Sequence, residues 1–90
     1  MKKTYSISST GIDSYLWDVR TVTRHALGVD NGDRVMYPLT YYIFTGRASL
    51  DFLHKLIEVS PARIARLLMG GGSDDSIMDR IKRTIKFKSE

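Results

Sequence analysis

The sequence predicts a small all-α domain of four or five helices, with a possible short strand or arm at the N-terminus. Three observations lead to this fold class. Apolar residues repeat at helical spacing in several separate segments, serines that can cap a helix precede these segments, and glycines follow them. Ninety residues suffice for one domain with a modest core. We therefore treat 1–90 as a single domain, in which 1–46 supports the C-terminal part, 47–90.

The N-terminal part begins with a weakly alternating segment and continues with a helix. Lys2 to Ser9 is compatible with a short strand or an ordered arm. A helix over 12–27 is predicted, capped by Ser9 or Thr10 and ended by Gly28. Trp17 lies off its apolar row and is expected at the edge of the core, or in contact with a partner chain. The apolar row of this helix consists of Ile12, Tyr15, Leu16, Val19, Val22, Ala26 and Leu27.

The segment that follows combines turn residues with an aromatic run. Val29 to Asp33 contains Asn-Gly, which favours positive φ, and a turn is predicted there. Met36 to Phe44 is continuously apolar and fits either a strand, by its aromatic content, or a short helix begun at Pro38. We favour the helix, because a strand would have only the N-terminal segment as a partner.

Two short helices are predicted close together in 49–69. The first carries Leu50, Leu53 and Ile57 on one face, at positions i, i+3 and i+7. Val59 marks a turn, after which Ser60-Pro61 supplies an N-cap and a proline at the first helical position. The second helix, 60–69, would bury one face and leave the other free. The residues predicted to be buried on it are Ile64, Leu67 and Leu68.

A final basic helix is predicted after the three glycines 70–72. Ser73 caps it, Asp74 and Asp75 lie in its first turn, and isoleucines recur every four residues from position 77. The run 80–88 holds five Lys or Arg residues among nine. A solvated helix face and a phosphate-binding stripe both account for such a run.

Composition narrows the function classes. The net charge is +4, and the surplus of cations is one in residues 1–46 and three in residues 47–90. There is no cysteine, and His25 and His54 have no ligand partners at a suitable spacing, so neither a metal nor a cofactor is expected. No apolar run approaches the ~18 residues of a membrane helix. Gly70 to Ser73 lacks the spacing of a phosphate-binding loop. These features argue against an enzyme and favour a cytoplasmic bacterial protein.

Residues 49–85 resemble the helix-turn-helix of the lac-repressor type, and more loosely that of phage repressors and Cro proteins. Ser49-Leu50 matches the opening of the pattern, Val59-Ser60 its turn, and Ile64 the buried branched residue of the recognition helix. Two positions depart from it. His54 replaces an alanine at the helix crossing and would have to lean outward, or the helices would have to sit further apart. Glu58 replaces the turn glycine, at an expected cost of about 1 kcal/mol.

The resemblance implies a DNA-binding site on the second helix. Arg66 would donate two hydrogen bonds to guanine, while Ala62 or Ala65 would touch a thymine methyl. The set of expected base-reading residues is Ala62, Ala65, Arg66 and Met69. The expected contacts to the DNA backbone are Arg47, Ser49, Ser60, Arg63, Lys82, Arg83, Lys86 and Lys88.

The expected function is that of a small sequence-specific DNA-binding regulator, such as a repressor of phage or plasmid type. The partner would be double-stranded DNA, and a homodimer would read half-sites about one turn apart. The aromatic segment 37–44 or the helix around Trp17 would supply the dimer contact. A protein-binding adaptor with this fold, such as an antitoxin-like protein or a phage factor that binds a host protein, is the alternative, with the N-terminal aromatic surface as its contact. A nonspecific architectural DNA binder is a third possibility.

Overall fold

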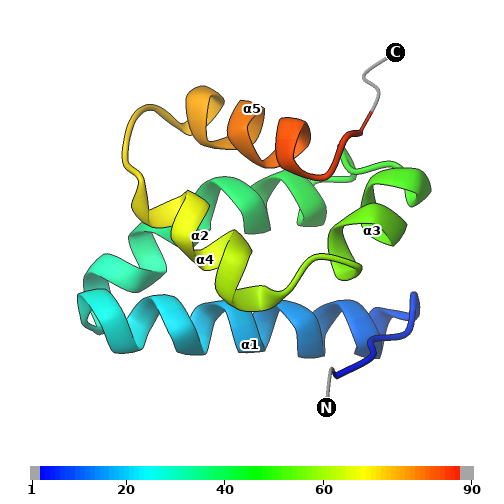
Figure 1. Ribbon diagram of the computed structural model, residues 1–90, viewed down its shortest axis with the longest axis horizontal. Coiled ribbons are helices and arrows are strands. Elements are labelled where there is room, and N and C mark those ends of the chain that lie inside the picture. Colours follow the sequence, from blue (N-terminus) through cyan, green and yellow to red (C-terminus); the bar gives the residue numbers. More distant parts are fainter. Residues whose placement is uncertain (1–2, 88–90) are drawn as a thin grey trace.

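The chain forms five helices in the computed structural model, which describes residues 3–87 (Figure 1). The predicted all-α class is confirmed, and no strand occurs in the described part of the chain. Lys2 lies outside the described residues, and the rest of the segment before the first helix is an arm. The helices are α1 (Ser9–Leu27), α2 (Val29–Phe44), α3 (Leu50–Ile57), α4 (Pro61–Met69) and α5 (Asp74–Thr84).

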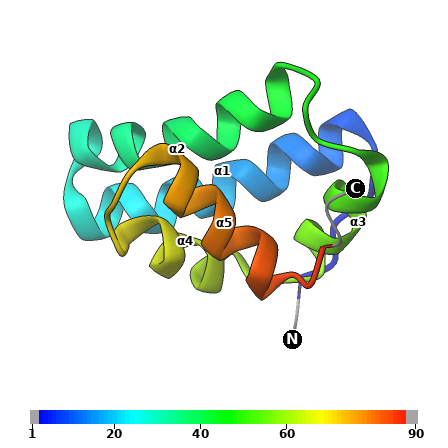
Figure 2. The same ribbon diagram turned by 90° about the horizontal axis from the view of Figure 1, so that it is seen from above.

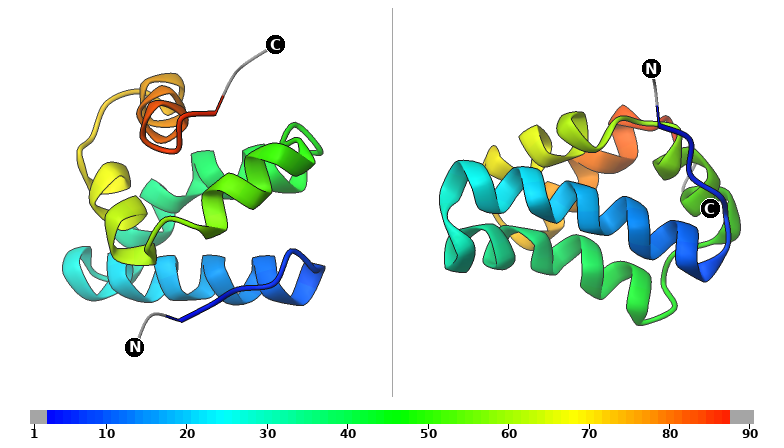
Figure 3. Two further views of the ribbon diagram at one scale, coloured as in Figure 1. Left: turned by 45° about the vertical axis from the view of Figure 1, so that its right-hand side comes forward. Right: turned by 90° about the horizontal axis from the view of Figure 1, so that it is seen from below.

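Helices α1 and α2 form an antiparallel pair on which the other three helices pack. Helix α4 lies mainly against α1, and α5 covers α2 and α4 from above (Figures 1 and 2). Helix α3 lies near the Ser9 end of α1 (Figure 1). In the view from above, α2 and α4 occupy opposite sides of the molecule, and the view from below agrees (Figures 2 and 3). This arrangement gives α2 and α4 two separate exposed surfaces.

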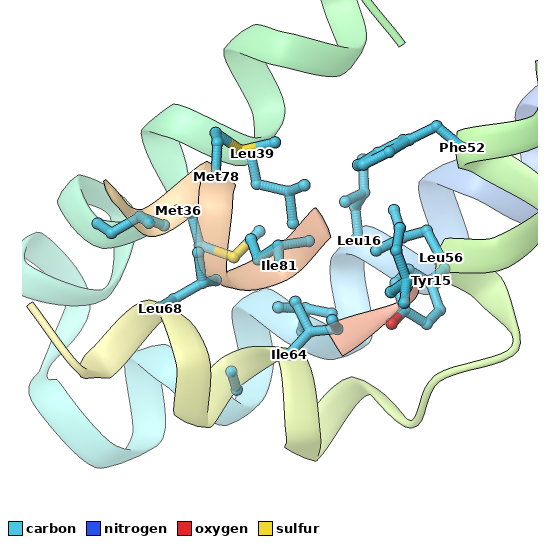
Figure 4. Packing of buried hydrophobic residues seen from close by; sticks show 14 of the residues in the cluster. Tyr15, Leu16, Met36, Leu39, Phe52, Leu56, Ile64, Leu68, Met78 and Ile81 are labelled. Atoms are coloured by element: carbon cyan, nitrogen blue, oxygen red, sulfur yellow. The ribbon is translucent and has the colours of Figure 1, made fainter. Parts of the chain in front are cut away.

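All five helices contribute side chains to one core (Figure 4). Helix α3 buries Phe52 and Leu56, so the prediction that Leu50 belongs to its inner face is wrong: that side chain is 64% exposed. The side of α3 that carries Phe52 faces the core, because this ring packs against two other aromatic rings. Its centre lies 5.0 Å from the centre of the Tyr42 ring and 5.4 Å from that of the Phe87 ring. Burial of a large aromatic ring outweighs burial of one leucine.

Helix α1 begins three residues earlier than predicted, and its cap is Ser8. The Ser8 hydroxyl accepts a hydrogen bond from the Gly11 amide at 3.1 Å, as N-cap serines do. The arm before it is held by Tyr5, whose hydroxyl donates to the Asp18 carboxylate. Partial burial and this bond raise the pKa of Tyr5 to about 12. Trp17 is 59% exposed, so its predicted place at the edge of the core is wrong.

The turn predicted over 29–33 is wrong, because these residues form the first turns of α2. Gly28 alone reverses the chain, with φ 85° and ψ 162°. Helix α2 therefore starts well before Pro38, which lies in its interior, and the helical interpretation of Met36 to Phe44 is confirmed. Asp33 accepts two hydrogen bonds from the Arg20 guanidinium, at 2.9 and 3.1 Å, and these bonds fix α2 against α1.

Gly32 serves as a contact point between two helices. A Cβ added there would lie 2.7 Å from the Arg24 Cα, which is closer than carbon atoms can approach. Glycine in a helix costs about 1 kcal/mol relative to alanine. The close packing of α1 on α2 offsets that cost.

Gly32→Ala is expected to destabilise the fold despite the better helix propensity of alanine. The new methyl group would push α1 and α2 apart, and the free energy of unfolding should fall by about 1–3 kcal/mol in urea denaturation. Asn31→Ala, at the exposed neighbouring position, is the control and should leave stability unchanged within about 0.5 kcal/mol. Equal stabilities of the two variants would refute the close-contact account.

Tyr15 connects α1 to the turn between α3 and α4. Its side chain is fully buried, and its hydroxyl donates to the Val59 carbonyl at 2.8 Å. The two residues lie 44 positions apart in the sequence. Burial raises the pKa of Tyr15 further above its ordinary value, at which the hydroxyl is already protonated and able to donate at neutral pH. This bond fixes the place from which α4 starts.

Tyr15→Phe is expected to lower the free energy of unfolding by about 1–2 kcal/mol, because the Val59 carbonyl loses its donor while the ring remains packed. Thermal or urea unfolding measures the change. Tyr37→Phe removes a hydroxyl from an exposed tyrosine and should be neutral. A neutral Tyr15→Phe would show that the bond contributes nothing to the fold.

Candidate nucleic-acid interface

Helix α4 is anchored by one side and exposed on the other. The Ser60 hydroxyl caps it by accepting from the Arg63 amide at 3.3 Å, and Pro61 occupies the first helical position, as predicted. Ile64 and Leu68 are fully buried. Arg63 and Arg66 are exposed on the opposite side. The short helix thus presents two guanidinium groups to the exterior.

One of the predicted base-reading residues is excluded by the fold. Ala65 has no exposed surface, so it cannot touch a base, and its place among the contact residues is corrected. The sequence pattern put Leu67 inside with Ile64 and Leu68. In the structure the buried side is turned toward Ala65 and Leu67 is half-buried, because α4 rests mainly on α1. A small residue suits such a closely packed helix contact.

The other predicted base-reading residues keep accessible surface. Ala62 and Arg66 are exposed, and Met69 is half-buried. On a helix these three positions fall on neighbouring lines of the outer side, since positions three and four apart share a face. The remaining contact surface consists of the Arg66 guanidinium, the Ala62 methyl group and the Met69 thioether.

The α3–α4 pair differs from the packed helix pair predicted from the sequence. The two helices have the predicted positions and order, but they barely touch each other. Helix α3 lies at one end of α1, and α4 crosses α1 further along (Figure 1). His54 is exposed, as expected for a side chain that leans outward. The orientation of α4 therefore depends on α1 rather than on α3.

The strain predicted at Glu58 is absent. This residue has φ −78° and ψ −19°, which is ordinary right-handed helical backbone. The turn forms instead through the amide groups of Glu58 and Val59, which bond to the Lys55 and Leu56 carbonyls at 3.3 and 3.0 Å. The expected cost of replacing glycine does not arise, since no positive φ is needed.

The predicted backbone-contacting cations fall into separate regions. Arg63 is on α4, while Arg83 and Lys86 are exposed toward the end of α5. Lys82 and Arg47 line a groove of about 500 Å³ between α2 and α5. The Lys82 ammonium lies 4.7 Å from the centre of the Tyr42 ring. The groove also contains three aspartates, Asp74, Asp75 and Asp79, which make it unfavourable for phosphate.

The two predicted serine contacts have structural roles already. Ser49 caps α3 by accepting from the Phe52 amide at 3.1 Å, and Ser60 caps α4. Both side chains are exposed. Lys88, the remaining predicted backbone contact, lies outside the described residues.

Sequence reasoning missed the role of Arg80. Its guanidinium donates to the Leu67 carbonyl at 3.0 Å and to the Gly71 carbonyl at 2.6 Å. It therefore adds a second hydrogen bond to the Leu67 carbonyl, which also accepts from the Gly70 amide at 3.3 Å, and connects α5 to the loop that follows α4. In the sequence Arg80 is one of five cations in a basic run, and nothing local distinguishes it.

Comparison with protein-family models, with curated proteins and with solved structures found no match. Among residues 3–87, no helix is both long and apolar enough to cross a lipid bilayer. In the same part of the chain, no group of three His, Asp or Glu side chains could hold a metal ion.

Arg80→Met should loosen the end of α4 while leaving its buried side in place. The variant keeps an apolar stem and loses the two charge-assisted hydrogen bonds, and it should lower the free energy of unfolding by about 1–3 kcal/mol. Amide hydrogen exchange should increase at residues 67–72. Arg83→Met, one turn further along α5 and exposed, is the matched control. Unchanged exchange at 67–72 in Arg80→Met would contradict the capping role.

Proposed function

We propose that this chain is a small DNA-binding regulator, of the kind found in phages or plasmids, that inserts the outer side of α4 into the major groove. It would act in the cytoplasm by occupying an operator. The observation that carries the proposal is the placement of Arg66 and Arg63. Both are exposed on a short helix whose other side is fixed in the core. A helix of this kind is the usual element for reading the major groove.

Each exposed side chain of α4 has a definite role in this proposal. Arg66 would donate two hydrogen bonds to guanine O6 and N7, and Ala62 would contact a thymine methyl group. Arg63 would bind phosphate through its guanidinium. Arg83 and Lys86 would add phosphate contacts. Because Ala65 is buried, direct readout would involve few bases, and DNA shape would contribute the rest of the specificity.

A protein-binding adaptor remains the second candidate, and one observation favours it. Trp17, Tyr37, Tyr41 and Phe44 are 44–65% exposed on the side of the molecule formed by α1 and α2. Exposed aromatic residues are enriched in protein interfaces. Capture of partners from a host lysate after nuclease treatment separates the two candidates, since a partner bridged by DNA is lost and a direct one stays.

Selection of bound sites from a random duplex pool, followed by titration at two salt concentrations, tests the DNA proposal. Arg66→Ala should cost about 1–3 kcal/mol at one base position and relax specificity there. Arg66→Lys keeps the charge but loses the two-pronged geometry, so it should relax specificity with a smaller loss of overall affinity.

Variants on α5 and in the segment directly after it supply the matched controls. Lys86→Ala should weaken binding to all sequences alike and reduce the salt dependence. Lys82→Ala should change little, because its ammonium lies on the Tyr42 ring in the groove that faces α2. No binding at low salt, or identical preferences for the wild type and Arg66→Ala, would count against the proposal.

A further inference from the structure

The segment before α1, residues 3–8, doubles back along the first half of this helix, and we call it the arm (Figure 3). The Lys3 ammonium lies 2.9 Å from the Asp18 carboxylate, and the Tyr5 hydroxyl donates a hydrogen bond to the same carboxylate. At the other end of the arm, the Ser8 hydroxyl caps α1. Among residues 3–87, the side-chain hydrogen bonds that leave the arm therefore all end on α1.

Gly11 of α1 is suited to a docked arm. A Cβ at this position would collide with the backbone carbonyl group of Ser6, and the three atoms nearest to it all belong to Ser6. Glycine within a helix is less favourable than alanine, because it has more conformational freedom to lose on folding. The close approach of the arm is therefore the reason that the structure gives for a glycine here.

Tyr5 joins the arm to the hydrogen bond that positions α4. Its ring lies edge-to-face against the ring of Tyr15, with the ring centres 5.0 Å apart and the planes at 89°. Tyr15 is fully buried, and its hydroxyl donates to the Val59 carbonyl at 2.8 Å. Val59 directly precedes Ser60, the cap of α4. A continuous path of contacts thus leads from the arm to the start of α4.

The arm is held less firmly than the helices. Four of its six residues are exposed, and Tyr5 and Ile7 are half-buried. The side chains of the Lys3–Asp18 ion pair are 58% and 31% exposed, and ion pairs of this kind contribute little to stability. A hollow of about 360 Å³ lies between residues 3–5 and the end of α3. A segment with so few buried contacts opens more readily than the core it covers.

We propose that the arm is a strap with a docked and a released state, and that docking fixes the start of α4 through Tyr15. In the docked state, Tyr5 covers the edge of the Tyr15 ring and keeps the Tyr15 hydroxyl on the Val59 carbonyl. Release would admit water to this ring. The hydroxyl would then bond to water part of the time, and the turn before α4 would gain conformational freedom. The strap thus acts on α4 without touching its outer side.

The consequence for DNA binding rests on the proposed function. The two arginines of that site, Arg63 and Arg66, are presented by α4, so their direction depends on how firmly this helix is held. With the arm released, part of that order would have to be restored on binding, which would lower the affinity for every DNA sequence alike. Docking of the arm is therefore a point at which binding at α4 can be regulated from α1.

Gly11→Ala tests the strap in the full chain without removing any contact group of the arm. The added methyl group should displace Ser6 and abolish the nuclear Overhauser effect between the Tyr5 and Tyr15 rings. Amide hydrogen exchange at residues 59–64, which form the turn and the start of α4, should become roughly tenfold faster. Exchange in the buried part of α2 should stay unchanged, because the core itself is not altered.

Three further variants separate the strap from general effects on stability. Tyr5→Ala removes the ring and should accelerate exchange at residues 59–64 in the same way as Gly11→Ala. Thr4→Ala, at an exposed position of the arm, is the matched control and should change nothing. In a Tyr15→Phe background the bond to Val59 is already absent, so Gly11→Ala should add less than about a twofold increase at residues 59–64.

Three results would overturn the proposal. An Overhauser effect that persists in Gly11→Ala would show that the arm does not depend on the space at Gly11. Equal acceleration along the whole chain would show that the arm adds only to global stability. A tenfold increase that is retained in the Tyr15→Phe background would exclude Tyr15 as the path. None of these measurements involves DNA, so they stand or fail independently of the proposed function.

Discussion

The burial of one long stripe of α1 is the constraint on which the rest of the structure depends. Ile12, Leu16 and Val19 lie along this stripe at 0–6% exposure, and the other helices assemble over it. Helix α2 approaches it closely at Gly32, and α4 rests on it at the centre of the molecule. Tyr15 adds a directional contact, since its hydroxyl holds the carbonyl that precedes α4. Apolar burial supplies the driving force, and this hydrogen bond sets the position.

Anchoring α4 on α1 determines which side chains reach the surface. A helix of nine residues has little stability of its own, so its orientation follows from the core it covers. Burial of Ile64, Ala65 and Leu68 leaves Arg63 and Arg66 outside. Arg80 then secures the far end of the helix through two carbonyl groups. The proposed interface is therefore held by hydrogen bonds near both ends of α4, which suits a surface that must present two guanidinium groups in a fixed register.

Glycine and proline account for most differences between the predicted and observed helices. The pair Asn31-Gly32 predicts a turn from the sequence. In the structure Gly32 lies within α2, and its lack of a side chain allows α1 to pack against it. Pro38 commonly marks a helix start, but α2 tolerates it in its interior while its side chain is buried. Conversely, position 58 does not require glycine, because Glu58 has right-handed helical backbone and needs no positive φ. Local patterns cannot distinguish a glycine required by conformation from one required by space.

The sequence alone determined the helical class, the limits of α3, α4 and α5 within a residue or two, and the serine caps of α4 and α5. Periodicity and capping are local properties, encoded within one or two turns. The tertiary structure decided the buried side of α3 and α4, the exposure of Trp17, and the separation of Lys82 from the outer side of α4. It also set α2 and α4 on opposite sides of the core. These features depend on which residues distant in the chain come into contact, and no short-range pattern carries that information.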